Sequence, residues 1–426
     1  MLLQTRRQLL RCGLVAAVLS IAKVHSQSSK APRRRQLSFG LRSSEMRVVD
    51  VESDTTYLLT APFETNATAV RIGLGNILPS SYHLDGICFA ECEFAESWSA
   101  SKWAYFSFPD AIASDEDVAP ASTPQKITVP GNRISFTGAT NVPTIYWSNW
   151  MKYKTSVNSN RPQMLFRALV PPQRLPLTFP DGPGDFRKFV PESAPRQIAQ
   201  MEIQGDYVTT PLLPPKNARD SAYCPIFVIQ YRTGTEGIQI VAGGDSHLNS
   251  WHTFFEQAAV GLSVPSLPIS VWNTAWGGQS SNTFWPILDQ AIDFCSPSIS
   301  VIQGWTANDG VRAVDGTRAA VDQAYLVRVK ESAERTMRLG GTPIILKGMP
   351  TKYLRRSGAL ASWLTVNQQL DNLVPGAIVF DPNPYVEASD QKGSWRFGFS
   401  DDAVHPNLAG NTELRAPFEG LLQSLM

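Results

Sequence analysis

The hydrophobic pattern of this 426-residue chain changes near residue 236, and that change limits the folds it can adopt. Between residues 45 and 232, short runs alternate apolar and polar positions and are separated by prolines, glycines and Ser/Asn/Asp clusters. Runs such as QKITVPGNRISFTG and QMLFRALVPP are rich in β-branched and aromatic residues, which is typical of antiparallel strands. Residues 45–232 therefore predict an all-β domain, a sandwich or a jelly roll.

From residue 236 to residue 426, short apolar segments alternate with longer helical ones, which predicts a second domain. The predicted strands are GIQIVAGG, PISVWNTA, SISVIQGW, TPIILKGMP and AIVFDPN. Five strands alternating with helices imply an α/β fold with a flavodoxin-like, doubly wound parallel sheet. Ligands bind such sheets at the carboxyl ends of the strands. The segments that follow each strand are therefore the first places to look for function.

The N-terminal residues 1–26 predict a signal peptide, because a basic start precedes a short apolar run and small residues. The Arg6-Arg7 pair and Lys23 favour a twin-arginine signal over an ordinary secretory one, and a retained anchor stays open. Either signal predicts export to a periplasmic or extracellular location. Residues 27–44 have the composition of a solvated linker.

The charge and the cysteine content exclude several classes of binding partner. Lysine plus arginine number 38 against 37 acidic residues, so the chain lacks the excess of positive charge that binds nucleic acid or an anionic membrane. Apart from Cys12 in the leader, the cysteines are Cys88, Cys92, Cys224 and Cys295. They form no disulfide framework, although a Cys88–Cys92 pair stays open, and their spacing gives no support for zinc.

Ser246 lies directly after the first predicted strand, in the stretch Gly243-Gly244-Asp245-Ser246. If a helix begins at this serine, its hydroxyl and N–H lie near a positive helix terminus, where an oxyanion is stabilised. Asp245 or Ser246 acting only as a helix cap is the alternative. The position alone does not distinguish a nucleophile from a cap.

A serine nucleophile needs a base, and the candidates are few. His83 lies in the β part, while His247 and His252 lie where neither side chain would face Ser246. His405, in FSDDAVHPNLAGN after the last strand, has Asp402 three residues before it. That spacing allows a carboxylate to orient the imidazole, although a surface turn begun by Asp401 or Asp402 is the alternative.

Two further loops contain possible oxyanion donors. AWGGQSS follows the second strand and offers Gly277 or Gly278, whose backbone N–H no side chain obstructs. GWTANDG follows the third strand and offers the Asn308 amide. Each loop is also an ordinary turn former.

Taken together, Gly-Asp-Ser, the glycine pair, Asn-Asp and Asp-x-x-His occur after successive strands, and residues 236–426 resemble the SGNH hydrolases, or GDSL esterases. The resemblance implies that Ser246 is the nucleophile and that its own N–H, Gly278 and Asn308 are oxyanion donors. It implies that His405 is the base and Asp402 its partner, with no cofactor and no metal. Gly278 is preferred to Gly277 because a polar run follows it.

The sequence departs from the family pattern at two positions. Where the family commonly has Gly-x-Asn-Asp, Thr306-Ala307 precede Asn308-Asp309 and Gly304 lies two places too early, so the local turn must differ; His247 replaces the usual leucine or isoleucine. Trp276 and Trp305 lie in the same loops and predict an aromatic contact with a sugar ring or an acyl chain. The β part resembles the N-terminal region of some bacterial members, with Trp147 or Trp150 as further contacts.

The resulting expectation is an exported serine esterase that acts on small-molecule or carbohydrate esters, with short acyl or acetyl groups. An O-acyltransferase that uses the same site is one alternative. A polysaccharide-binding protein with a degenerate hydrolase domain is another. A peptidase has no supporting signature.

Overall fold

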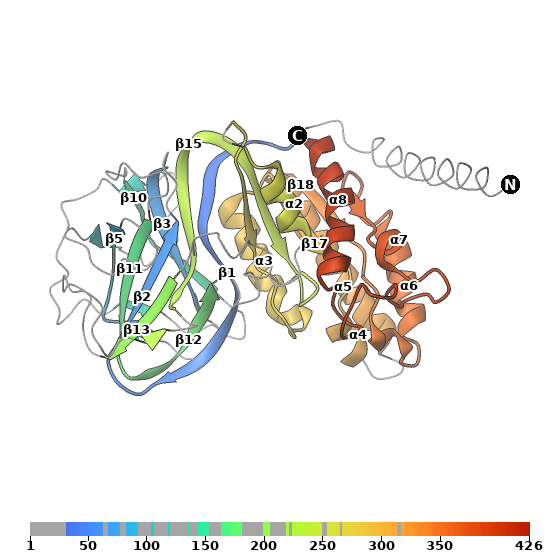
Figure 1. The fold of residues 1–426 in the computed structure, drawn as a ribbon, viewed down its shortest axis with the longest axis horizontal. Helices are drawn as coiled ribbons and strands as arrows, with labels where there is room; N and C mark the ends of the chain where they lie inside the picture. The colour runs from blue at the N-terminus through green and yellow to red at the C-terminus, as the bar shows by residue number, and fades with distance from the viewer. Residues whose placement is uncertain are drawn as a thin grey trace. The chain divides into compact units, whose positions relative to one another are not determined.

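The computed structural model describes residues 31–62, 67–76, 82–92, 104–105, 118–119, 134–136, 144–152, 163–180, 199–204, 219–220, 224–248, 254–264, 266–312 and 317–426. They form two compact units (Figure 1). The β-rich unit comprises the described residues of Arg34–Thr253 and Ser263–Pro297. The helical unit comprises the described residues of Phe254–Leu262 and Ser298–Met426, together with residues 31–33.

The β-rich unit contains two larger sheets and one strand pair. The first sheet is antiparallel and has the order β14 (Arg219–Asp220), β13 (Ala199–Gln204), β2 (Thr55–Pro62), β11 (Gln163–Val170), β5 (Gly86–Cys92), β6 (Ala104–Tyr105). The second contains β1 (Arg35–Val51), β3 (Ala67–Asn76), β7 (Val118–Ala119), β9 (Thr144–Trp147), β10 (Trp150–Lys152), β12 (Gln173–Pro180), β15 (Ile226–Gly243) and β16 (Ile269–Asn273). The pair is β4 (Tyr82–Leu84) with β8 (Ile134–Phe136).

Side chains from both larger sheets share one hydrophobic core. Leu59 and Phe166 come from the first sheet, and Ile72 and Ile229 come from the second; all four are buried. Strands with alternating patterns bury one face each, so two such sheets packed face to face exclude water from both. The choice between a sandwich and a jelly roll stays a prediction.

Strand β15 is unusually long, at 18 residues, and has two different sets of neighbours. Its first part pairs antiparallel with β1 and β3, while Ile238–Ala242 pairs parallel with β16. Its last seven residues are buried without interruption, which is typical of a parallel strand covered on both faces. The sequence division at residues 232–236 lies inside this strand, and β1 begins at Arg35, inside the segment 27–44.

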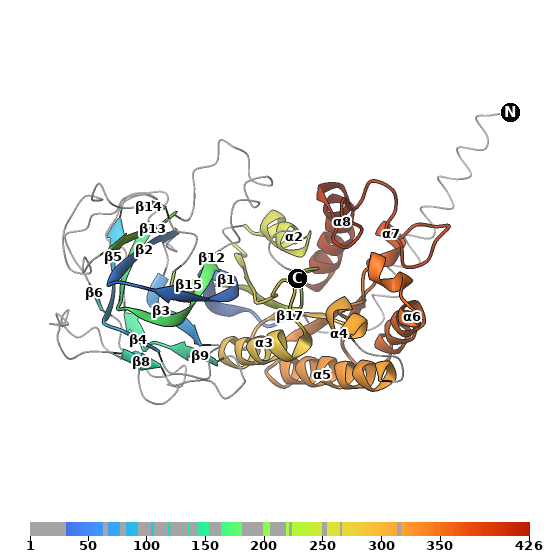
Figure 2. The same ribbon diagram turned by 90° about the horizontal axis from the view of Figure 1, so that it is seen from below.

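The helical unit is built on three parallel strands, in the order β17 (Ile299–Gln303), β18 (Thr342–Leu346), β19 (Ile378–Phe380). Its helices are α2 (Phe254–Leu262), α4 (Ala307–Arg312), α5 (Arg318–Arg338), η3 (Lys352–Arg355), α6 (Ala359–Leu370), α7 (Asn383–Val386) and α8 (Leu408–Leu425). Helix α3 (Ser281–Cys295) belongs to the β-rich unit. Figure 2 shows α2 beside α8, and α5 beside α6. Strands that alternate with helices and pair in parallel are the α/β pattern that the sequence predicts.

Aromatic rings attach α2 and α8 to the sheet of the helical unit. Phe418 in α8 lies edge-on to Phe254 in α2 and to Phe380 in β19, with ring centroids 5.3 and 5.2 Å apart. All three rings are buried, and such pairs contribute about 0.5–1.5 kcal/mol each beyond the area they bury. This packing holds α8 against α2 and β19.

Gly304, at the end of β17, has room for no side chain. Its N–H donates to the Leu346 carbonyl at 2.6 Å, and a Cβ would lie 2.6 Å from that same oxygen and 2.4 Å from Leu370 Cδ1. We expect Gly304→Ala to lower the free energy of unfolding by about 1–3 kcal/mol, because the substituent overpacks the contact of β17 with β18. Denaturant titration measures this change. Gly420→Ala is the control, since an added Cβ there meets nothing within 4 Å and favours the helix. Equal stability of the Gly304 variant and the unmutated chain would contradict the expectation.

Candidate active site

The predicted nucleophile, Ser246, lies in a tight turn at the end of β15 and is partly exposed. Asp245 is 1 % exposed; its Oδ1 accepts from the His247 N–H at 2.9 Å, and its carbonyl accepts from the Leu248 N–H at 3.1 Å. Residues 246–248 therefore form a turn, and the prediction that a helix begins at Ser246 is wrong; α2 begins at Phe254. Two hydrogen bonds to Asp245, from the N–H groups of residues 247 and 248, hold the turn.

The loop after β16 holds the Ser246 turn in place. Asn273 is buried; its Nδ2 donates to the Leu248 carbonyl at 2.5 Å, and its Oδ1 accepts from the Ala275 N–H at 3.0 Å. The Trp276 N–H donates to the Gly244 carbonyl at 2.9 Å. The turn is therefore bonded both before and after Ser246, which fixes the position of the serine. Sequence reasoning missed Asn273; its polar side chain at the end of an apolar strand was the available signal.

Gly278, the predicted oxyanion donor of the same loop, has a φ of +71°, a conformation that glycine adopts without strain. No atom lies within 4 Å of the place where a Cβ would stand, so the backbone conformation rather than space requires glycine here. Its role as a donor stays a prediction. Trp276 is 6 % exposed, which leaves little of its ring for a substrate, and its predicted contact stays a prediction.

In the helical unit, the structure brings together the predicted base and its partner. His405 Nδ1 lies 2.7 Å from Asp402 Oδ2, while Asp402 Oδ1 accepts from the Val404 and His405 N–H groups at 2.8 Å each. Ala403 has a φ of +58°, and this left-handed residue lets the carboxylate of residue 402 reach the ring of residue 405. Backbone strain at such a position is typical of functional loops.

The Asp402 carboxylate is held in its ionised form. Partial burial of the carboxyl opposes ionisation, but the His405 and Val404 N–H donors and the His405 ring outweigh it and hold the Asp402 pKa well below its usual range. A permanently ionised Asp402 keeps a proton on Nδ1, which leaves Nε2 as the basic nitrogen. The pair can therefore orient a histidine for general base catalysis.

Neighbouring side chains separate the roles of the two adjacent aspartates. The Lys352 N–H donates to the Ala403 carbonyl at 2.7 Å, and Lys352 Nζ donates to the Asp402 carbonyl at 3.2 Å. Asp401 instead accepts from Asn407 Nδ2 at 2.8 Å, and Asn407 also caps α8 by accepting from the Gly410 N–H. Asp401 therefore ties the loop to the helix, while Asp402 alone contacts the imidazole.

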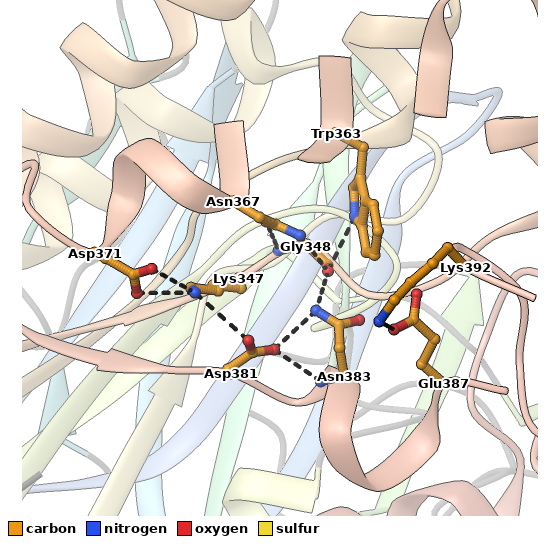
Figure 3. Close-up of polar contacts among 9 residues, drawn as sticks. All are labelled: Lys347, Gly348, Trp363, Asn367, Asp371, Asp381, Asn383, Glu387 and Lys392. Carbon is orange, nitrogen blue, oxygen red and sulfur yellow. Dashed lines mark hydrogen bonds and ion pairs between the residues drawn. The ribbon is translucent and has the colours of Figure 1, made fainter. Parts of the chain in front are cut away.

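The segment that leads from β18 to Lys352 is fixed by a buried network (Figure 3). The Gly348 carbonyl accepts from Trp363 Nε1 at 3.0 Å, Asn383 Nδ2 at 3.1 Å and Asn367 Nδ2 at 3.2 Å, and its N–H donates to Asn367 Oδ1 at 2.8 Å. One carbonyl with three donors cannot shift without losing several buried hydrogen bonds. The network supports Lys352 and, through it, the loop of His405; no sequence motif marked it.

Asn308, the third predicted donor, lies partly exposed in the first turn of α4. Its N–H donates to Thr306 Oγ1 at 3.1 Å, so Thr306 caps this helix. The donor role of Asn308 stays a prediction. Trp305 is 1 % exposed, so its predicted contact with substrate, which stays a prediction, has almost no surface available.

Trp147 and Trp150 take part in a stack inside the β-rich unit. The Arg71 guanidinium lies between them, 4.3 Å from the Trp147 ring centroid and 4.5 Å from the Trp150 ring centroid, and Arg232 lies 4.6 Å from Trp150. Arg71 Nε also donates to Gln230 Oε1 at 2.8 Å. Guanidinium groups, and not an open cleft, therefore cover these indole faces.

The remaining sequence predictions fall into three groups. The side chains of Cys88 and Cys92, in β5, lie outside what the structure describes, so their pairing stays a prediction; Cys224 and Cys295 are buried and are not in a disulfide. Within the described ranges, no cluster of three or more His, Cys, Asp or Glu side chains has the arrangement of a metal site, and no helix could span a membrane. The signal peptide and His252 lie outside the described residues.

No protein-family model matches the chain, and no curated protein matches its sequence. Among solved structures, the chain is similar to a GDSL-like lipase from Bacteroides thetaiotaomicron, with 16 % identity and a TM-score of 0.35 over 44 % of this chain and 89 % of that one. It is also similar to an acetylxylan esterase from Geobacillus stearothermophilus, with 17 % identity and a TM-score of 0.34 over 44 % of this chain and 94 % of that one. These neighbours are of the SGNH type that the sequence resembles.

Proposed function

We propose that this protein is an exported serine esterase that hydrolyses short-chain acyl or acetyl esters, including esters on carbohydrate. The observation that carries the proposal is the Asp402–His405 pair, with a 2.7 Å contact to a carboxylate whose pKa is held low. A buried or surface turn needs no such pair, whereas a general base needs its tautomer fixed. The Ser246 turn supports the proposal, because its two bonded sides hold a serine at the carboxyl end of a strand.

In the proposed reaction, Ser246 Oγ attacks the ester carbonyl while His405 Nε2 accepts the hydroxyl proton. The carbonyl oxygen becomes an anion, and the N–H groups of Ser246 and Gly278 and the Asn308 amide donate to it. His405 then gives the proton to the leaving alcohol, and an acyl-serine remains. Water, deprotonated by His405, attacks the acyl-serine; the bond from the acyl carbon to Ser246 Oγ breaks, His405 returns the proton to that oxygen, and the acid is released. Asp402 stays ionised throughout and stabilises the imidazolium.

Two measurements on the full chain test the proposal. An alkyl fluorophosphonate is expected to add once, at the peptide that contains Ser246, because such reagents phosphonylate activated serines. Hydrolysis of chromogenic esters of increasing acyl length is expected to be fastest for acetyl or other short chains. An acceptor sugar included in the assay distinguishes hydrolysis from O-acyl transfer by its products. No label and no turnover would contradict the proposal and favour a polysaccharide-binding protein.

A further inference from the structure

The two most exposed large apolar side chains on the described part of the chain lie on either side of the Asp402–His405 loop. Phe397 is 101 % exposed and Leu408 is 56 % exposed. Burying a phenylalanine ring removes apolar surface from water, so a fully exposed ring favours contact with another molecule. Single exposed apolar residues are common, but the position and rigidity of these two set them apart.

Hydrogen bonds on both sides of Phe397 hold its backbone. The Arg396 N–H donates to the Val386 carbonyl at 2.7 Å, and the Phe399 N–H donates to the Arg396 carbonyl at 3.1 Å. On the other side, Asn407 Nδ2 donates to the Gly398 carbonyl at 3.0 Å, and the Asn407 N–H donates to the Phe399 carbonyl at 2.9 Å. The ring is therefore presented by an ordered turn, which lowers the entropy lost when a ligand binds.

The same turn is joined to the proposed catalytic loop. Ser400 Oγ donates to Asp402 Oδ1 at 3.3 Å, and Asn407, which bonds residues 398 and 399, is two positions after His405. Leu408 begins α8 immediately after Asn407. The segment 394–400, which contains Trp395, Phe397 and Phe399, therefore directly precedes the loop that contains Asp402 and His405.

We propose that segment 394–400 is a binding platform for an acylated polysaccharide, in which Phe397 stacks on the apolar face of a sugar ring beside His405. This inference rests on the proposed esterase function and names its substrate class. A sugar ring has one C–H face and a rim of hydroxyls, so it needs an aromatic face with polar neighbours. Arg396, next to Phe397 in the chain, and Asp401, in the loop that follows, are both exposed and add charge to this segment. An acyl chain or a lipid surface would require a continuous apolar patch, which these charged side chains interrupt.

Binding is measured first in full-length Ser246→Ala protein, so that the polymer is not hydrolysed. The probe is soluble acetylated xylan, with the same xylan after deacetylation as the second ligand, and the method is isothermal titration calorimetry. Adding Phe397→Ala is expected to weaken binding of both polymers about fivefold to tenfold, the range of an aromatic contact. Phe397→Tyr is expected to restore binding to within twofold. The matched control is Leu364→Ala, which removes a side chain that is 44 % exposed on α6, and it is expected to leave the affinity for both polymers unchanged.

Activity measurements with Ser246 intact give the second readout. In Phe397→Ala the KM for acetylated xylan is expected to rise about fivefold to tenfold, while kcat and the turnover of a small chromogenic acetate stay within twofold. Unchanged polymer binding in Phe397→Ala would overturn the platform, as would a loss of binding to phosphatidylcholine vesicles with polymer binding retained. If the unmutated chain hydrolyses no ester, the esterase proposal falls, whereas the calorimetric comparison still decides whether Phe397 binds the polymer.

Discussion

Ser246→Ala is expected to lower kcat for chromogenic acetate hydrolysis by about 10⁴-fold or more, because the residual site can bind and polarise an ester but cannot form the acyl-serine. Asp245 and Asn273 hold the turn through hydrogen bonds with backbone groups of residues 247, 248 and 275, and both side chains are kept in the variant. We therefore expect the variant to fold, with an unfolding midpoint close to that of the unmutated chain. Initial rates at saturating substrate measure the effect.

Ser280→Ala is the matched control for this measurement. Ser280 precedes α3 and makes no side-chain capping bond, so its hydroxyl can be removed at little cost to the helix. Its kcat is expected to stay within twofold of the unmutated value. If the Ser246→Ala variant keeps more than a tenth of the activity, Ser246 is not the nucleophile.

Asp402→Asn is expected to lower kcat by about 10³- to 10⁴-fold while KM changes little. An amide can occupy the same space, but it cannot stabilise an imidazolium and it favours the wrong tautomer of His405. Asp401→Asn is the control, because Asp401 bonds Asn407 and not the imidazole; its kcat is expected to stay within a few-fold. Equal losses of kcat in the two variants would mean that activity depends on the conformation of the loop and not on the carboxylate of residue 402.

The pH dependence of stability provides an independent signature of Asp402. Its pKa is lower in the folded chain than the usual value near ~3.9. A group with a depressed folded pKa stabilises the fold above its unfolded pKa, and that contribution is lost as the pH falls through the folded pKa. Unfolding midpoints measured from neutral pH down to below pH ~4 should therefore fall less steeply in Asp402→Asn than in the unmutated chain. Parallel curves would show that the carboxylate is not stabilised in its ionised form.

Several features of the site followed from sequence spacing alone. Asp402 and His405 are three residues apart, and a turn of that length allows a carboxylate to reach an imidazole. The parallel strands of the helical unit followed in the same way, because short β-branched and apolar segments such as SISVI and TPIIL alternate with helical segments. Both are local patterns, and local patterns are visible in a sequence.

Other features depended on contacts between distant segments. The turn that stands where a helix was predicted is also held by Asn273, 25 positions after Leu248, whose Nδ2 donates to the Leu248 carbonyl. Likewise, the continuity of β15 is set by its partners on either side, since Ile226 to Gly237 pair with one set of strands and Ile238 onward with another. Propensity within a window of a few residues contains no information on such partners.

The sequence by itself determined the class of the fold and the residue types available for acyl transfer, because periodicity and short-range spacing specify strands, helices and the Asp-x-x-His turn. Only the tertiary structure decided which side chains remain exposed. Trp276 and Trp305 are as aromatic as Phe397, yet they are buried and Phe397 is not. Exposure depends on the summed packing of residues that lie far apart in the chain, and hydrophobicity at one position does not report it.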